Sequence, residues 1–311
     1  MEKSANERVF FTHIQIINAQ SCDLTMIKLM MYLTVAVLCS VAVSVLLKIL
    51  RQKNIDIRQT IVAGYPVAFL LTWLLLKPDV SSIGALGNAW GIIIALGVLL
   101  PAVFVILGRA IESVGMVATD AAQRLSLIIP IVAAFLLFGE VLTGTRTFGL
   151  LLGFLALGAL VYRPQHGLIN SQAKQTPLWL FGVWLGYGVI DILFKQVAKQ
   201  GAAFPLTLFV TFGLAGLLLL VYLLSTRVRW QGKALSAGLL LGALNMGNIY
   251  AYVRAHQVLS ESPSIVFTGM NVGVIAVATL IGVGVFKERL NRVNMVGLLL
   301  AIGCVAVLFL L

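Results

Sequence analysis

The chain alternates between long apolar runs and short polar segments. In ten places the apolar residues continue for 17 to 25 positions, the length that an α-helix needs to cross a bilayer. We therefore predict an all-α integral membrane protein with ten transmembrane helices. Their predicted ranges are 29–48, 57–76, 90–111, 114–138, 146–162, 178–197, 204–224, 233–253, 264–286 and 293–311.

The polar segments divide these helices into two groups of five. The longest connection, RPQHGLINSQAKQT, lies at 163–176. The first segment is polar and lacks the continuous apolar region and cleavage site of a signal peptide. We therefore predict four parts: a leader at 1–28 that we expect to be disordered, a five-helix unit at 29–162, a linker at 163–177 and a second five-helix unit at 178–311.

The two units resemble each other in sequence. FGEVLTGTRTFGLLL at 138–152 aligns without gaps on FKERLNRVNMVGLLL at 286–300, and VLLK at 45–48 lies on ILFK at 192–195. Because each unit crosses the membrane an odd number of times, the second unit must enter from the opposite face. The sequence therefore predicts two inverted five-helix repeats, an arrangement in which transporters place their site between the repeats near mid-membrane.

Composition agrees with this class. Hydrophobic residues make up 60% of the chain and charged residues 11%, against about 25% charged in soluble domains. The net charge of +11 comes from residues scattered through short loops, so we expect no nucleic-acid partner. The three histidines and three cysteines show no metal-ligand spacing, and we expect no metal and no cofactor. The expected partners are a small-molecule substrate and the lipid bilayer, with the oligomeric state left open and a monomer included.

Ionic residues inside the predicted helices are the first candidates for chemistry. Among the acidic residues, Asp120 and Asp191 alone fall well inside a span, and Arg124 is the basic residue near a helix centre. Each costs roughly 2.5–3.5 kcal/mol in the membrane and normally faces the bundle interior or water. Two interpretations stay open: Asp120 and Arg124, four apart on one helix face, neutralise each other in a helix interface, or they line a transport cavity in which Arg124 pairs with Asp191.

Uncharged polar residues extend the candidate site. Asn245, Asn248 and Tyr252 share one helix face, and Asn271 occupies the repeat position of Gln123. We predict that they line the cavity, although amides also join helices in membranes and the aromatic residues Trp184 and Tyr187 also suit packing. The candidate substrate-binding residues are Asp120, Gln123, Arg124, Trp184, Tyr187, Asp191, Asn245, Asn248, Tyr252 and Asn271, with Asp120 and Asp191 as candidates for proton coupling.

LSLIIPIVAAFLLFGEVLTGTRTFGLLLGFLALGALV at 125–161 resembles the EamA-type repeat of the drug/metabolite transporter superfamily, through Pro130, Glu140 and Gly149. The second copy keeps Glu288 and Gly297. The resemblance covers residues 29–311 and implies an inner-membrane metabolite carrier with a central cavity. It also implies cytoplasmic termini, whereas 13 Lys and Arg on the opposite side against 8 on the side of the termini favour termini outside; the orientation stays open.

These observations predict a secondary transporter that moves a small polar metabolite, amino-acid-like or otherwise charged or zwitterionic, across the inner membrane by alternating access, with proton coupling left open. The alternatives are a multidrug or nucleobase-type exporter of the same fold, or a non-transporting membrane scaffold. The chain contains no HExxH, GxSxG or GxxxxGK[ST] motif, so we expect neither catalysis nor ATP-driven pumping.

Overall fold

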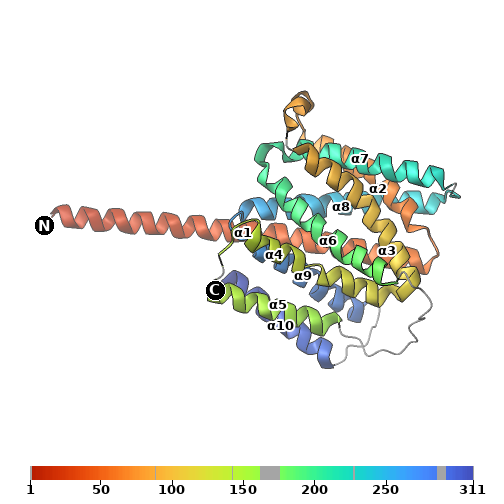
Figure 1. Ribbon diagram of the computed structural model, residues 1–311. Coiled ribbons are helices and arrows are strands. Elements are labelled where there is room, and N and C mark those ends of the chain that lie inside the picture. The colour runs from red at the N-terminus through yellow and green to blue at the C-terminus, as the bar shows by residue number, and fades with distance from the viewer. Residues whose placement is uncertain are drawn as a thin grey trace.

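The computed structural model describes residues 2–87, 89–141, 143–161, 176–226, 228–285 and 292–310, which form helices and short connections (Figure 1). Two short helices, the π-helix η1 (Thr72–Leu76) and the 3-10 helix η2 (Val80–Leu86), follow α2, and the 3-10 helix η3 (Gly201–Ala203) precedes α7. The α-helices are α1 (Glu2–Gln52), α2 (Ile57–Leu71), α3 (Ala89–Leu125), α4 (Ile128–Leu136), α5 (Gly144–Val161), α6 (Thr176–Lys199), α7 (Phe204–Ser225), α8 (Gly232–Val258), α9 (Pro263–Gly284) and α10 (Arg292–Leu310).

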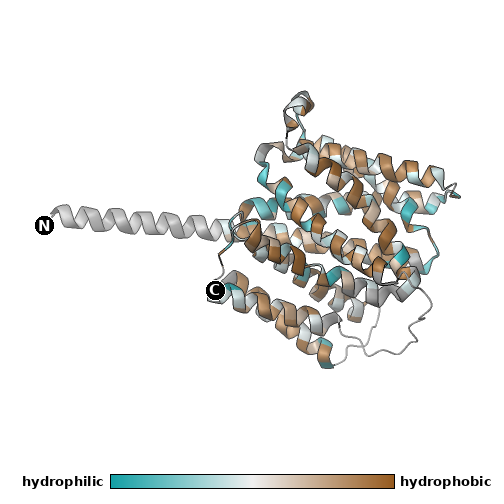
Figure 2. Cartoon of the chain, in the orientation of Figure 1, coloured by the Kyte–Doolittle hydropathy of each residue, from teal (hydrophilic) through white to brown (hydrophobic). Residues whose placement is uncertain are grey.

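The protein is a multi-pass helical membrane protein. Within the described ranges, seven helices are long and apolar enough to cross a bilayer, and three shorter apolar helices lie at Ala122–Leu136, Gly144–Ala159 and Arg292–Leu308. Apolar residues cover the middle of the bundle, while polar residues concentrate at its ends (Figure 2). Large apolar side chains such as Leu136 and Leu299 are 78% and 70% exposed, which suits contact with lipid.

The structure places two boundaries differently from the predicted ones. The backbone of the leader forms the start of α1, which differs from the disorder that we expected there. The predicted helix at 114–138 is also divided, because α3 continues to Leu125 and α4 begins at Ile128. The break lies one turn before Pro130, whose ring lacks an N–H and clashes with the carbonyl four residues earlier. Residues 163–175 of the predicted linker lie outside the described residues.

The helices of the two halves pack against each other throughout the bundle. α2 lies along α8, α3 along α6 and α7, α1 along α8 and α9, and α5 along α10. The contact between α2 and α8 is especially close, because a Cβ added to Gly242 would lie 2.3 Å from the carbonyl oxygen of Gly64. Glycine at this position lets the two backbones touch.

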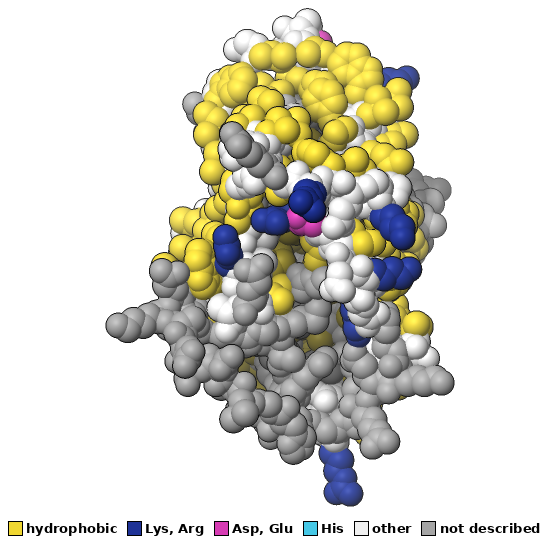
Figure 3. All heavy atoms as spheres, turned by 90° about the vertical axis from the view of Figure 1, so that its right-hand side faces the viewer, with side chains coloured by type: hydrophobic (Ala, Val, Ile, Leu, Met, Phe, Trp, Pro, Cys, Tyr) yellow, Lys and Arg dark blue, Asp and Glu magenta, His cyan; other side chains and the backbone are white. Residues whose placement is uncertain are grey.

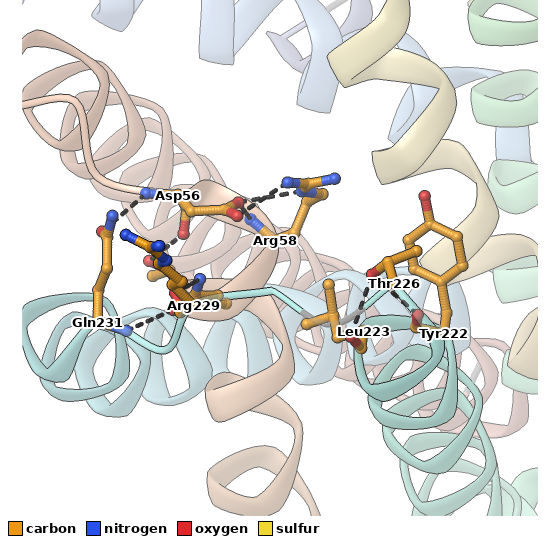
Figure 4. A network of polar contacts seen from close by, with 9 residues as sticks. Asp56, Arg58, Tyr222, Leu223, Thr226, Arg229 and Gln231 are labelled. Carbon is orange, nitrogen blue, oxygen red and sulfur yellow. Dashed lines mark hydrogen bonds and ion pairs between the residues drawn. The ribbon is translucent and has the colours of Figure 1, made fainter.

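A polar network ties the two halves together at one end of the bundle (Figure 4). Gln59 donates from Nε2 to the carbonyl of Arg229 at 2.7 Å and accepts at Oε1 from the backbone N–H of Gln231, also at 2.7 Å. The side chain of Gln231 in turn accepts from the N–H of Asp56 at 3.2 Å. Lys and Arg side chains gather over this same end, around a small acidic patch (Figure 3).

Asp56 caps the start of α2 within this network. Its carboxylate accepts from the backbone N–H and the guanidinium of Arg58 at 2.9–3.1 Å. Burial raises the pKa of the Asp56 carboxyl, but the hydrogen bonds and the positive charge of Arg58 outweigh burial and leave the pKa lowered.

At the opposite end, Glu140 joins the connection after α4 to the start of α9. Its two carboxylate oxygens accept from the Ser264 backbone N–H at 2.9 Å and the Ser264 hydroxyl at 2.5 Å, and the Arg146 guanidinium lies 3.7 Å away. A carboxylate at a helix N-terminus satisfies free N–H groups and suits the helix dipole. Glu140 of the first half therefore caps a helix of the second half. Its counterpart Glu288 lies outside the described residues.

Candidate functional site

A cavity of about 250 Å³ lies in the interior of the bundle. Its walls come from the last third of α1, from α2, α6, α8 and α9, from the middle of α3 and the residues around its end, and from Phe212 of α7. Typical small-molecule pockets measure about 300–1,000 Å³. The cavity is slightly smaller than this range, which favours a ligand of metabolite size.

The structure brings most of the predicted site residues together at this cavity. They come from the end of α3 and from three helices of the second half, so residues up to 148 positions apart in the sequence share one wall. The predicted residues that line the cavity are Gln123, Arg124, Tyr187, Asp191, Asn245, Asn248, Tyr252 and Asn271.

Asp191 and Tyr252 form the central polar contact. The Tyr252 hydroxyl donates to Asp191 Oδ1 at 3.0 Å and thereby joins α6 to α8. The Tyr252 ring is held in place by edge contacts with Phe194 and His256, at centroid distances of 6.4 and 4.8 Å. Among the described residues, Asp191 has Tyr252 as its hydrogen-bond partner, and the two interpretations of Arg124, a pair with Asp120 or a pair with Asp191, stay predictions.

The amides differ in how well they are satisfied. Asn271 donates from Nδ2 to the carbonyl of Phe267, one turn earlier in α9, at 3.0 Å. Asn248 has a buried Oδ1 that accepts no hydrogen bond from the described part of the chain. A buried acceptor without a donor costs about 1–3 kcal/mol, so Asn248 offers the cavity an acceptor that a ligand can satisfy.

Two predicted residues are not among those that line the cavity. Trp184 donates from Nε1 to the carbonyl of Leu125 at 3.1 Å and lies beside Phe181 at a centroid distance of 5.7 Å. It satisfies a carbonyl that the break between α3 and α4 leaves without a helical partner, which agrees with the packing alternative. The backbone of Asp120 belongs to α3, but its side chain lies outside the described residues.

The structure also adds polar residues that sequence reasoning missed. Ser40 and Ser44 of α1 and Tyr65 of α2 line the cavity. The two serines are four positions apart in the apolar span Thr25–Leu50 of α1, so they share a face, and this spacing was a usable signal. Tyr65 had no comparable signal, because a single tyrosine in an apolar span suits packing equally well.

Comparison with known proteins places the chain in a family. No protein-family model matches the chain. A crystal structure of another protein is 12% identical and superposes with a TM-score of 0.66 over 89% of this chain and 94% of that chain, which shows a shared fold. A Haemophilus influenzae protein described as uncharacterized is 47% identical over 279 residues, which are 88% of this chain and 96% of that protein. The chain therefore belongs to the same family as this Haemophilus influenzae protein.

Proposed function

We propose that the protein is a secondary transporter of the EamA type, which moves a small charged or zwitterionic metabolite across the inner membrane by alternating access. The observation that carries the proposal is the central cavity, where polar side chains from both halves meet inside a membrane-embedded bundle. Such intramembrane ionisable and amide groups are costly and normally mark a substrate or ion path.

The packing of the helices supports ten crossings in two inverted repeats. In such a repeat, α1–α5 correspond in order to α6–α10. The contact between α3 and α6 then has its equivalent in the contact between α8 and α1. The contact between α2 and α8 likewise has its equivalent in the contact between α7 and α3. All four contacts exist, and so do those of α4 with α6 and α9 with α1. A duplicated five-helix unit explains this pairing, which unrelated halves would have no reason to show.

The lining of the cavity supports the same correspondence. At the offset of 147 that aligns VLLK with ILFK, all four lining positions of α1 fall on the four lining positions of α6. At the offset of 145 that aligns Arg109-Ala110 with Arg254-Ala255, the four lining positions in the middle of α3 fall on lining positions of α8. The pairs are Ser40–Tyr187, Val43–Ile190, Ser44–Asp191, Leu47–Phe194, Leu100–Asn245, Val103–Asn248, Phe104–Ile249 and Leu107–Tyr252.

These equivalent positions differ in chemistry, which bears on the substrate. The α3 positions are all apolar, whereas three of their four α8 counterparts are polar. The cavity thus has one apolar wall and one polar wall, and Arg124 and Asp191 supply charges of opposite sign. We infer a substrate with an apolar part and a zwitterionic part, whose carboxylate meets Arg124 and whose ammonium meets Asp191.

An asymmetry between the halves supports alternating access. α6 packs against α8 through the hydrogen bond from Tyr252 to Asp191, whereas the equivalent helices α1 and α3 make no comparable contact in the described ranges. We infer that the cavity is closed at the end where α6 and α8 finish and opens toward the other end. If the contact between α6 and α8 opened and an equivalent contact formed between α1 and α3, the cavity would open to the other side of the membrane. Protonation of Asp191 or Asp120 is the proposed route for proton coupling.

Transport by the purified protein in liposomes tests the proposal. A metabolite library is first screened by thermal shift, because a bound ligand stabilises the folded state, and the hits are then offered as radiolabelled substrates. We expect uptake by the wild type, at least tenfold loss in Asp191→Asn and Arg124→Gln, and normal uptake in the matched controls Asp79→Asn and Arg229→Gln. Uptake that is unchanged in both cavity variants contradicts the proposed site.

The apolar wall also favours a second candidate, an exporter of larger apolar compounds of the multidrug type. In that case, lipophilic cations or planar drugs would stabilise the protein, and zwitterionic metabolites would not. Absence of transport for every compound that stabilises the protein would favour the non-transporting scaffold instead.

A further inference from the structure

A second hollow, here called the outer pocket, lies where α6 and α8 end, on the side from which α1 projects (Figure 1). Its volume is about 520 Å³, and the lining includes Lys195, Lys199, Arg254, His256 and Gln257. It is separate from the central cavity, with which it shares no lining residue.

Three cations surround the outer pocket. The ammonium of Lys195, whose side chain is buried, donates to the carbonyls of Ser260 at 2.8 Å and His256 at 3.5 Å, so one of its three N–H groups remains for the pocket. The Lys199 ammonium lies over the ring of Phe138, 4.5 Å from its centroid. Arg254 donates from Nη1 to Gln257 Oε1 at 2.9 Å.

Acidic groups do not neutralise this charge within the pocket. The described lining residues include no Asp or Glu. The carboxylates that act on Lys195 from nearby are those of Glu140 and Glu261. Glu140 is engaged by Ser264, and Glu261 is exposed. The pocket therefore keeps a net positive character.

Two side chains leave polar groups unpaired at this pocket. His256 is completely buried, and neither ring nitrogen has a hydrogen-bond partner in the described part of the chain; the same holds for Arg254 Nε. The His256 ring touches Tyr252 and Phe267 at centroid distances of 4.8 and 4.7 Å. A neutral imidazole carries one N–H donor, so the residues that line the pocket include donors of the Lys, Arg and His types, a combination that suits a ligand made of acceptors.

The outer pocket follows the central cavity along the same two helices. On α6, Asp191 lines the cavity and Lys195 the pocket; on α8, Tyr252 lines the cavity and His256 the pocket. Four residues of helix correspond to about 6 Å. We call the contact between Tyr252 and Asp191 the partition, because these two residues line the cavity one helical turn before the pocket begins.

We propose that the outer pocket is an anion-binding vestibule, which takes a phosphate or carboxylate group between Lys199 and Arg254 with His256 as a neutral donor. Its role as a vestibule rests on the proposed transport function, since it would hold the acidic group of the substrate just beyond the partition. The binding of an oxyanion itself rests only on the chemistry of the pocket.

Thermal unfolding of the purified full-length protein, with inorganic phosphate titrated at constant ionic strength, tests the binding. We expect a saturable rise in Tm with phosphate but not with chloride, and its loss in the double variant Lys199→Gln/Arg254→Gln. The control Lys53→Gln/Lys233→Gln removes two exposed positive charges at the opposite end and should keep the response. A wild type without a saturable rise, or an equal rise in the Lys199→Gln/Arg254→Gln variant, overturns the proposal.

Two further experiments show whether the bound anion is a free oxyanion or a lipid headgroup, and whether the outer pocket takes part in transport. Phosphatidylglycerol and phosphatidylcholine are compared in nanodiscs; stabilisation by phosphatidylglycerol alone, with no response to free phosphate, assigns the pocket to a lipid headgroup and overturns the vestibule. Transport that persists without phosphate binding removes the vestibule but leaves the transporter. Phosphate binding without any transport leaves the anion site but contradicts the proposed function.

Discussion

Gly242 of α8 lies where a single added methyl group should separate two helices. Its Cβ would lie 2.3 Å from the carbonyl oxygen of Gly64 and 2.9 Å from the Gly64 carbonyl carbon. Carbon–oxygen contacts normally measure about 3.3–3.6 Å, so α2 and α8 would have to move apart by about 1 Å. Because the obstructing atoms are backbone atoms of Gly64 and the Cβ of Val67, no change of rotamer relieves the clash.

The expected cost follows from two opposing effects. Overpacking of a close contact costs about 1–3 kcal/mol, and a backbone obstruction places Gly242→Ala at the upper end. Alanine recovers about 1 kcal/mol through its better helix propensity. We therefore expect the free energy of unfolding to fall by about 2 kcal/mol. Gly238→Ala should act in the same direction, because its Cβ would lie 2.6 Å from the carbonyl oxygen of Thr60.

Gly158→Ala in α5 is the matched control. A Cβ at Gly158 meets no atom within 4 Å, so only the propensity effect remains, and the variant should be unchanged or stabilised by up to about 1 kcal/mol. Equilibrium unfolding of the purified variants in detergent, followed by circular dichroism, measures both values. If Gly242→Ala is as stable as the wild type, or if both substitutions shift stability equally, the close contact between α2 and α8 is wrong.

Three further predictions concern the ends of the helices. Glu140→Gln should lower the free energy of unfolding by about 1–3 kcal/mol, because it weakens the charged cap on Ser264. Chemical denaturation measures this loss. The control Glu261→Gln alters an exposed carboxylate and should change the free energy of unfolding little. Lys195→Met should cost a similar amount, because it leaves carbonyls at the end of α8 without a donor, and an equally stable variant would contradict the two hydrogen bonds of its ammonium. Since the pKa of Asp56 is lowered, its contribution to stability is present above its ordinary value of 3.8 and is lost as the pH falls through the lower folded value. When the free energy of unfolding is measured as the pH falls below 3.8, Asp56→Asn should therefore lose less stability than the wild type. Parallel curves for the two proteins would show that the Asp56 carboxylate does not stabilise the fold.

Much of the candidate site could be read from the sequence because membranes penalise buried polarity. A charge or amide inside an apolar span must face the interior, so Arg124, Asp191 and Asn271 could be assigned to the bundle interior without coordinates. Helical periodicity did the same for Asn245, Asn248 and Tyr252, which share a face of α8. The inverted repeat stays a prediction, which the equivalent lining positions of α1 and α6 support.

Contacts between distant segments could not be read in this way, because a helical pattern identifies the inward face but not the neighbour that it meets. The hydrogen bond from Tyr252 to Asp191 was not predicted, and Trp184 lies against the break after α3 and is not among the residues that line the cavity. The outer pocket likewise could not be predicted from the sequence, since Lys195 and His256 are 61 positions apart. Hydropathy and periodicity are local properties that establish a helical membrane protein with a polar interior, whereas the choice of partners depends on how the helices cross in space.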